Sequence, residues 1–327
     1  MSVLYAATGD AIARITLEGG AAASAVVGLE GSGACCLAVD PLEPDRVYVG
    51  TFDHGVRVSD DGGVSWREPD ARPADERVLA LAVSRAADVA YAGTEPSNLY
   101  RSEDAGRTWE LLPALRELPS EPEWSFPGRP WTHHVRTIAL HPADAATLLV
   151  GVELGGVMRS TDGGASWADH NPQAPRDAHE MATHPLAPDR VYEAAGDGVA
   201  RSEDAGASWT HVEAGLDRGY AWATAVDRDD ADLWYVAVST GPFVAHGRGD
   251  GEARVMRTHN GGWSPTGSWG DTPELRRMPY ALATLSGRPG VVVAGLRGGL
   301  LMASEDAGES WTRLDLELPD VVAMAAP

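Results

Sequence analysis

The chain has 327 residues and a formal net charge of −22, because 48 acidic residues stand against 26 basic ones. Hydrophobic residues make up 43% of the sequence, which is enough to build a core and excludes a disordered chain. The acidity excludes nucleic-acid backbones and anionic membrane surfaces as default partners, because both attract basic proteins.

Short strands separated by Gly, Pro and Asp turns, with no helical periodicity, predict an all-β protein. Residues 3–29 contain three strands, and units with four strands each then follow along the chain. These complete units occupy residues 35–70, 78–112, 135–170, 180–213, 223–269 and 281–318. Four-stranded units of roughly 40–45 residues are typical of propeller blades.

The two ends of the chain supply the parts of one further blade. Residues 3–29 lack a first strand, and residues 321–326 resemble a first strand with nothing after it. Joining them removes free sheet edges, which would otherwise invite aggregation. The sequence therefore predicts one domain over residues 1–327, a seven-bladed β-propeller with four-stranded antiparallel blades that is closed between the termini. A six-bladed propeller is the alternative.

One octapeptide, Ser-x-Asp-x-Gly-x-Ser/Thr-Trp, occurs in five close copies, and a weaker copy occupies residues 258–265. Its glycines permit tight turns, its aspartates can accept hydrogen bonds from the turn's backbone amides, and its tryptophans bury a large apolar surface. Five copies argue for a structural rather than a catalytic role. These structural residues are Asp61, Asp104, Asp162, Asp204 and Asp306, with Trp66, Trp109, Trp167, Trp209 and Trp311.

The octapeptide resembles the Asp-box, or BNR, repeat, and the chain is similar to BNR-repeat propellers along its whole length. Proteins with this motif include sialidases, xyloglucan-degrading glycosidases, sortilin-type receptor domains and a photosystem II assembly factor. The resemblance implies the fold and leaves the activity open. A sialidase would carry an Arg-Ile-Pro motif, whereas the first blade has only Arg14. Tyr280, Glu153 and Asp53 could stand for the sialidase Tyr, Glu and Asp, but no local motif supports them.

In a propeller, the loops between blades and the loops between second and third strands lie on one face, at the mouth of the channel. When the blades are aligned with one another, several positions of that face hold polar or aromatic residues where Leu or Val is expected. Asp177 is one of these polar residues. We expect a small anionic or carbohydrate ligand, or a protein segment, to bind there; a solvated polar rim is the alternative. The candidate binding residues are Arg77, His134, Arg136, His179, Tyr220, Trp222, Arg277, Tyr280 and Arg297.

Two kinds of chemistry remain open at this mouth. Glu153 and Glu180 could act as a general acid and base in a glycoside hydrolase or lyase, if their separation suits that reaction. His133, His134 and His179 could bind a divalent metal, although no spacing motif supports this, so that no cofactor is the default expectation. A protein-assembly scaffold that uses the same face is a further alternative, and we expect a monomer.

Two insertions lengthen loops on the mouth face. Residues 113–132 are rich in Pro and Trp, which predicts an ordered, lid-like loop, and residues 239–253 extend a second loop. The adjacent Cys35 and Cys36 are expected to be small buried hydrophobic residues rather than a disulfide or zinc site.

The sequence shows no signal peptide or membrane helix, which favours a cytoplasmic protein. The acidity and the absence of lysine favour adaptation to high salt, where screening weakens the repulsion between carboxylates. A GC-rich genome is the alternative explanation.

Overall fold

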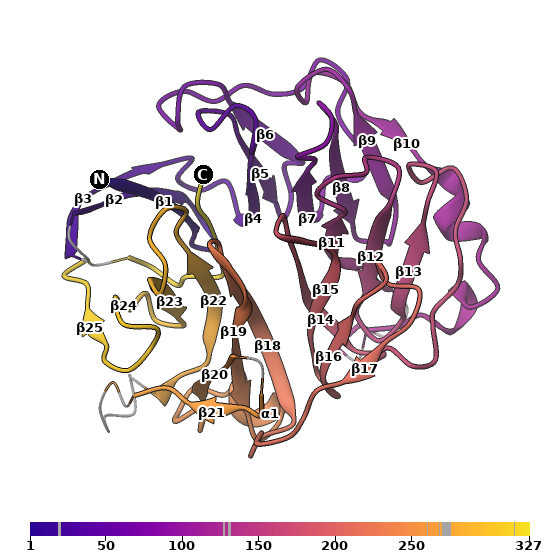
Figure 1. Ribbon diagram of the computed structural model, residues 1–327. Coiled ribbons are helices and arrows are strands. Elements are labelled where there is room, and N and C mark those ends of the chain that lie inside the picture. Colours follow the sequence, from indigo (N-terminus) through magenta and orange to yellow (C-terminus); the bar gives the residue numbers. More distant parts are fainter. Residues whose placement is uncertain are drawn as a thin grey trace.

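The computed structural model describes residues 1–18, 21–126, 128–129, 132–259, 261–267, 269, 276–316 and 318–327. It contains seven antiparallel sheets arranged as blades around a central channel (Figure 1). The prediction of a seven-bladed β-propeller is thereby confirmed. In the described part of the chain no helix is long and apolar enough to cross a membrane.

The strands are grouped into blades in chain order, except that the C-terminal strand belongs to blade 1. Blade 1 consists of β26 (Ala323–Ala325), β1 (Ser2–Ala7), β2 (Ile12–Glu18) and β3 (Ala21–Gly28). Blades 2 and 3 consist of β4 (Ala34–Val39), β5 (Val47–Thr51) and β6 (Val56–Ser59), and of β7 (Val78–Val83), β8 (Ala90–Thr94), β9 (Leu99–Ser102) and β10 (Glu110–Leu111). Blades 4 and 5 consist of β11 (Val135–Leu140), β12 (Leu148–Val152) and β13 (Gly156–Ser160), and of β14 (Ala178–His184), β15 (Ala187–Ala195), β16 (Gly198–Ser202) and β17 (Thr210–His211).

The last two blades have four strands each. They consist of β18 (Tyr220–Asp227), β19 (Asp230–Ser239), β20 (Arg254–His259) and β21 (Ser264–Pro265), and of β22 (Pro279–Thr284), β23 (Val292–Leu296), β24 (Leu301–Ser304) and β25 (Thr312–Arg313). Among the elements that the structure describes, three short helices interrupt the strands, namely η1 (Pro113–Glu117), η2 (Glu121–Glu123) and α1 (Pro242–Ala245).

The two chain ends close the ring as predicted. β26 is the innermost strand of blade 1 and pairs antiparallel with β1, so that Tyr5 lies opposite Ala325 and Ala7 opposite Ala323. Both termini consequently lie at the same blade in Figure 1. In blades 2 and 4 the expected fourth strand is reduced to a single bridge, between Val58 and Arg67 and between Arg159 and Ala168.

The innermost strand of each of blades 2 to 7 carries a β-bulge near its start. At each bulge one residue is skipped in the pairing with the second strand. A bulge redirects the side chain of the extra residue, and here all of these residues line the channel. The residues are Cys35, Leu79, Arg136, His179, Trp222 and Tyr280.

Glycines in the second strands allow neighbouring blades to pack closely. A Cβ atom added at Gly93 would lie 2.3 Å from Cγ1 of Val135 in the next blade, and one at Gly151 would lie 2.9 Å from Cβ of Ala178. The small residue is required at these positions because the next innermost strand occupies the space that a side chain would fill.

The octapeptide turns are held by their aspartates. Oδ1 of Asp61 accepts hydrogen bonds from the amides of Val64 and Ser65, and Oδ2 accepts one from the Ser65 hydroxyl at 2.6 Å. The Ser59 hydroxyl donates to Asp61 and accepts from the amide of Gly63, which has φ +87°. The hydrogen bonds from Ser65 are the main reason why the pKa of Asp61 falls to about 2.

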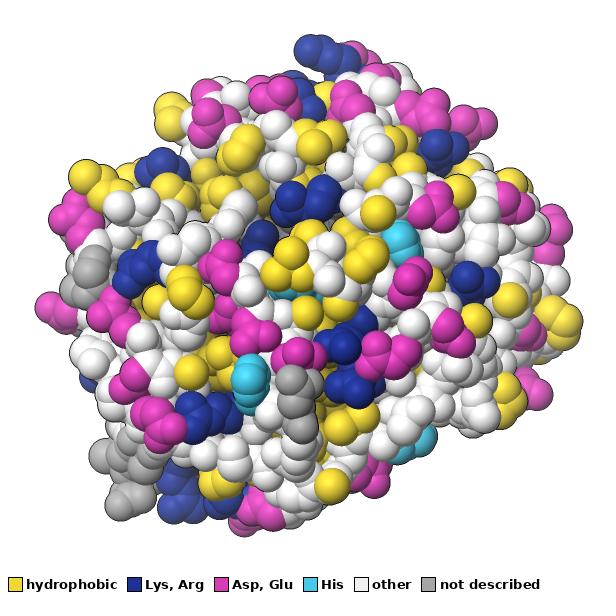
Figure 2. Space-filling model, viewed as in Figure 1, with side chains coloured by type: hydrophobic (Ala, Val, Ile, Leu, Met, Phe, Trp, Pro, Cys, Tyr) yellow, Lys and Arg dark blue, Asp and Glu magenta, His cyan; other side chains and the backbone are white. Residues whose placement is uncertain are grey.

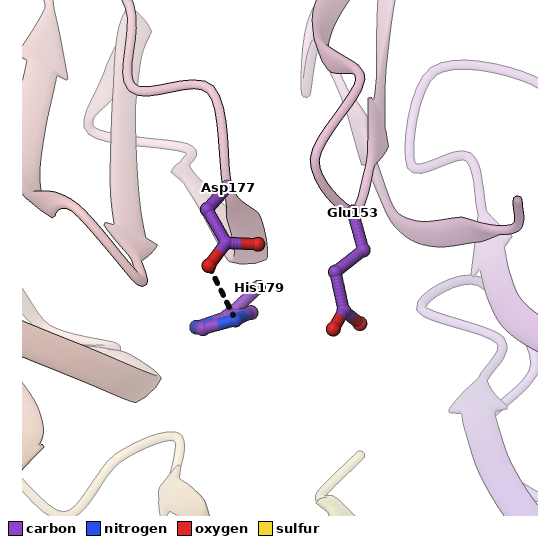
Figure 3. A group of neighbouring side chains, drawn as sticks. All are labelled: Glu153, Asp177 and His179. Carbon is purple, nitrogen blue, oxygen red and sulfur yellow. Dashed lines mark ion pairs between the residues drawn. The ribbon is translucent and has the colours of Figure 1, made fainter. Parts of the chain in front are cut away.

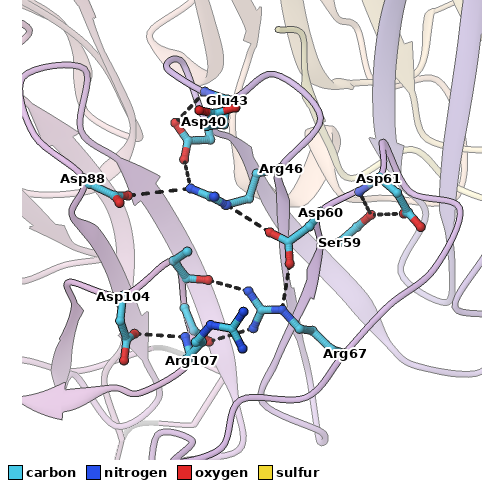
Figure 4. A network of polar contacts seen from close by, with 12 residues as sticks. Asp40, Glu43, Arg46, Ser59, Asp60, Asp61, Arg67, Asp88, Asp104 and Arg107 are labelled. Carbon is cyan, nitrogen blue, oxygen red and sulfur yellow. Dashed lines mark hydrogen bonds and ion pairs between the residues drawn. The ribbon is translucent and has the colours of Figure 1, made fainter.

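Arginines connect neighbouring blades through these turns (Figure 4). Arg67 of blade 2 donates to the carbonyl of Ala105 at 2.6 Å in blade 3, and Arg159 of blade 4 donates to the carbonyl of Ala205 at 2.7 Å in blade 5. Arg46 pairs with Asp40 and Asp60, both at 3.0 Å. Acidic side chains are otherwise spread over the face seen in Figure 2, where they do not gather into one patch.

Replacing Asp61 by Asn is expected to lower the melting temperature at pH 7 by a few degrees, because the turn loses its ionised acceptor. The folded pKa of Asp61 is about 2, against 3.8 for the ordinary group. Its stabilisation is therefore complete above about pH 4 and is lost as the pH falls toward 2. Thermal denaturation from pH 7 to pH 2 should show the two proteins converging in acid, whereas the control Asp70→Asn, at an exposed residue outside the turn, should follow the wild type throughout. A constant gap between D61N and wild type would contradict this assignment.

Candidate functional site

Three ionisable residues meet at the channel mouth between blades 4 and 5 (Figure 3). Glu153 follows β12 directly, Asp177 directly precedes β14, and His179 is the bulged residue of β14. One atom of each side chain, a carboxylate oxygen or a ring nitrogen, lies within 4.8 Å of the other two. The two loops thus place two carboxyl groups and an imidazole around one small space.

The orientation of His179 is fixed by its backbone partner. Its Nδ1 lies 2.7 Å from the carbonyl oxygen of Ala221, which can only accept, so Nδ1 carries the proton. The lone pair of Nε2 therefore faces Asp177, whose Oδ2 lies 3.6 Å away. Burial lowers the pKa of His179 to about 4, so the ring is neutral around pH 7.

The two carboxyl groups are in opposite protonation states over a wide pH range. Burial alone would raise the pKa of Glu153, but the hydrogen bond from His134, at 3.0 Å, and the charge of Arg136 hold it at about 2. Burial and the nearby charges of Glu153 and Asp197 raise the pKa of Asp177 to about 7. An ionised carboxylate therefore faces a carboxyl group that keeps its proton up to about neutral pH.

An aromatic wall continues the site into blades 6 and 7. The guanidinium of Arg136 lies 4.6 Å from the ring centre of Trp222, whose other neighbours include His179 and His246, both at 4.5 Å between ring centres. His246 lies between two tyrosine hydroxyls, with Nε2 at 2.6 Å from Tyr220 and Nδ1 at 2.8 Å from Tyr280. Because a neutral imidazole donates at one nitrogen and accepts at the other, these contacts lock the rings together.

The other candidate arginines of the mouth already have partners. Arg77 pairs with Glu95 at 3.0 Å and lies 4.3 Å from the ring centre of Phe52. Arg297 donates to the carbonyls of His246 and Gly247. The guanidinium of Arg277 lies against the turn at Gly298 in its own blade. These side chains therefore frame the mouth instead of converging on a single point.

The structure separates some residues that the sequence grouped together. Glu180 points into the channel, where its carboxylate accepts from the amide of Thr224 at 2.7 Å and burial raises its pKa to about 7. The carboxyl group that faces Glu153 is thus that of Asp177. His133 turns away from His134 and packs on Trp124, with ring centres 5.5 Å apart.

Sequence reasoning missed two residues of the site. Asp177 was recognised as a polar exception of the mouth but not as the partner of Glu153, and its position two residues before His179 at the start of a predicted first strand was the available signal. His246 was not singled out, although the insertion at 239–253 that contains it was. That insertion forms α1, whose Phe243 is 94% exposed.

The insertion at 113–132 reaches the mouth from the side. It forms η1 and η2, anchors Trp124 in the core, and places the ring of Phe126 5.1 Å from that of His134. Arg129 pairs with Glu95 at 2.7 Å. Residues 127, 130 and 131 of this expected lid lie outside the described residues.

The site offers three hydrogen-bonding groups to a ligand. The ionised Glu153 accepts hydrogen bonds, the protonated Asp177 can donate one, and the free lone pair of His179 accepts another. The same pair of carboxyl groups suits proton transfer. Glu153, Asp177 and His179 together also offer two oxygens and one nitrogen to a divalent cation.

No family model matches this chain. A stretch of 83 residues, 24% of the chain, is 31% identical to an oligoxyloglucan-reducing end-specific xyloglucanase of Emericella nidulans and covers 10% of that protein. The structure is similar to a GH74 xyloglucanase from Xanthomonas campestris, with a TM-score of 0.61 and 20% identity over 86% of this chain and 45% of that one. It is also similar to YCF48 bound to D1 peptide, with a TM-score of 0.58 and 14% identity over 86% of this chain and 81% of that one.

The chain therefore spans less than half the length of both xyloglucanases that it resembles. At these levels of identity the likeness to the solved structures concerns the fold alone. The chain thus has the seven-bladed propeller fold that GH74 xyloglucanases and YCF48 share.

Proposed function

We propose that the channel mouth binds a carbohydrate, and that Glu153 and Asp177 face one of its sugar units. The observation that carries this proposal is the pair itself, an ionised and a protonated carboxyl group with oxygens within 4.8 Å. Sugar hydroxyls both donate and accept hydrogen bonds, so they match a pair in which one member accepts and the other donates.

The surroundings of the pair support a sugar rather than a strongly charged ligand. The charge of Arg136 is close to that of Glu153, at 3.9 Å, and the neighbouring His179 is neutral around pH 7. Trp222 and Tyr280 add aromatic surface beside these polar groups, an arrangement common in small-molecule sites. Two of the similar proteins are xyloglucanases, which suggests xyloglucan oligosaccharides as the first compounds to test.

Isothermal titration calorimetry with xyloglucan and cellulose oligosaccharides at pH 6 is expected to show saturable binding to the wild-type protein. Glu153→Gln and Asp177→Asn should each weaken it at least tenfold, because a charged or protonated hydrogen-bonding group is lost. The control Glu76→Gln changes a half-exposed carboxylate that pairs with Arg72, at 3.6 Å, and should bind as the wild type does. Absence of binding to the whole panel, or unchanged binding in both site variants, would refute the proposal.

Glycoside hydrolysis is the second candidate, because carboxyl oxygens of Glu153 and Asp177 lie within 4.8 Å of each other and the two groups differ in protonation state. Retaining glycosidases hold their carboxyl groups about 5–5.5 Å apart, and they need one protonated and one ionised member. Analysing the oligosaccharides for new reducing ends after the binding experiment decides between the two: products that E153Q and D177N fail to form would show a hydrolase, whereas bound but intact oligosaccharides would leave a binding protein.

A protein segment is the remaining occupant to test, because one similar structure is described with a bound peptide. If oligosaccharides fail to bind, the exposed Phe243 of α1 and the aromatic wall around Trp222 are the surfaces on which a peptide would be sought.

A further inference from the structure

The opposite end of the channel opens into a second cavity, of about 470 Å³, far from the mouth cluster along the innermost strands. Its rim is formed by the first or second residue after the innermost strand in each of blades 2 to 7. Three of these residues are prolines and one is a serine, whereas blades 3 and 6 contribute arginines. In chain order the rim reads Pro41, Arg85, Pro142, Pro185, Arg228 and Ser286.

The two rim arginines converge from well-separated blades. Blades 3 and 6 are three places apart, the largest separation that a ring of seven allows. The guanidinium of Arg228 nevertheless reaches the carbonyl of Ala326 in blade 1, at 2.8 Å. Burial lowers the pKa of Arg228, and the charge of Arg85 lowers it further, against a smaller opposing effect of Asp229. Arg85 and Arg228 line the same cavity, so their positive charges repel one another there.

Neither arginine has an acidic partner in the described part of the chain. Arg85 makes no hydrogen bond or ion pair there, and Arg228 makes only the one to Ala326. The residues that line the cavity include no Asp or Glu. The nearby His184 is already satisfied, because Nε2 donates to the carbonyl of Asp227 and Nδ1 accepts from the amide of Leu186.

The protein has a net charge of −22, and many of its other arginines pair with carboxylates. Arg77 and Arg46, for example, each contact at least two carboxylates. Arg85 is exposed, whereas Arg228 is half-buried, and a half-buried arginine near a second positive charge without a counter-charge raises the free energy of the folded protein. An anion between the two guanidinium groups would remove that cost and form charge-assisted hydrogen bonds.

We propose that this cavity binds a small organic anion, with its carboxylate or phosphate group between Arg85 and Arg228. The rest of the ligand would lie on the innermost strands, where Ile138, Val226 and Leu282 contribute apolar side chains to the wall. Guanidinium groups suit both head groups, because their planar donors match paired oxygens. This site is independent of the carbohydrate site proposed at the mouth.

Calorimetric titration with octanoate and, separately, with inorganic phosphate tests the site at constant ionic strength. We expect at least one probe to bind the wild type with one-to-one stoichiometry, and to bind Arg85→Gln and Arg228→Gln at least tenfold more weakly. Binding of octanoate alone would show that the apolar wall contributes, and binding of both probes would show that the two arginines suffice for an anion.

Two further variants make the result specific. Arg107→Gln removes the same charge from an exposed turn of blade 3 and should bind the probe as the wild type does. Glu153→Gln, at the other end of the channel, should do so as well. Equal affinity in R228Q and wild type, equal weakening in R85Q and R107Q, or no binding of either probe to the wild type would overturn the proposal. Melting temperatures of the unliganded variants should match or exceed that of the wild type, because the repulsion between the arginines is removed.

Discussion

Trp234→Ala is expected to destabilise the propeller by about 3–5 kcal/mol, the usual cost of removing a buried aromatic side chain. Trp234 lies in the second strand of blade 6 and is only 1% exposed. Its ring centre lies 5.1 Å from that of Tyr192 in blade 5 and 4.8 Å from that of Trp263 in its own blade. The alanine would leave a cavity between two blades, and it would also remove the hydrogen bond from Nε1 to the Thr224 hydroxyl.

Urea and thermal denaturation measure this effect, which should lower the melting temperature by on the order of 10 °C. Trp234→Phe keeps most of the packing and should cost less than the alanine. Phe243→Ala, at a residue that is 94% exposed, is the control and should leave the melting temperature within about a degree of the wild type. Equal melting temperatures for W234A and F243A would mean that the contact between blades 5 and 6 does not stabilise the ring.

The sequence was sufficient to predict the architecture because its signals are local and repeated. Each octapeptide specifies a turn through hydrogen bonds within a few residues, as Asp61 shows, so the blade boundaries can be counted along the chain. Each end of the chain holds only part of a blade, so the sequence predicted that residues 321–326 pair with the first strands. β26 pairs with β1 as predicted. The bulges were not predicted, because a bulge depends on the register between two strands rather than on either sequence alone.

Aligning equivalent positions of the blades predicted only part of the candidate site. Aligning the blades identified His179, Trp222 and Tyr280 as residues of one ring, and the structure places all three along the channel. It did not show which carboxyl group faces Glu153. Neighbouring residues in a strand point to opposite sides, and the bulge at His179 changes which side Glu180 takes, so its carboxylate lies down the channel while Asp177 remains at the mouth.

The contacts of the histidines and arginines could not be predicted from aligned positions either. His133 and His134 are adjacent, so only one of them could face Glu153, and the insertion at 113–132 provides Trp124 as the partner of the other. Arginines were sought at the mouth, where carboxylates and carbonyls turned out to bind them. Arg85 and Arg228 lie at the far end of the channel, where a sequence shows only that Arg replaces Pro.

Asp177→Asn is expected to gain stability relative to the wild type as the pH rises from about 4 to about 7. The folded pKa of Asp177 is about 7, against 3.8 for the ordinary group, because burial, Glu153 and Asp197 disfavour its charge. The folded wild type therefore binds this proton more tightly than the unfolded chain does, and its stability falls over that range while the proton is lost. Asparagine has no proton to lose, so the variant is spared this loss.

The full effect amounts to about 4 kcal/mol at most, since each pH unit of difference is worth about 1.4 kcal/mol and Asp177 retains some contact with solvent. Urea denaturation of both proteins at pH 4, 5.5 and 7.5 and constant ionic strength measures it as a difference. Groups that titrate in both proteins, such as His179, largely cancel in that difference. A gap that widens in favour of D177N toward pH 7.5 would establish a protonated carboxyl group beside an ionised Glu153, which is the property on which both carbohydrate binding and acid catalysis at the mouth depend. Parallel stability curves would instead mean that Asp177 is ionised at pH 6, and the mouth would then have lost its hydrogen-bond donor.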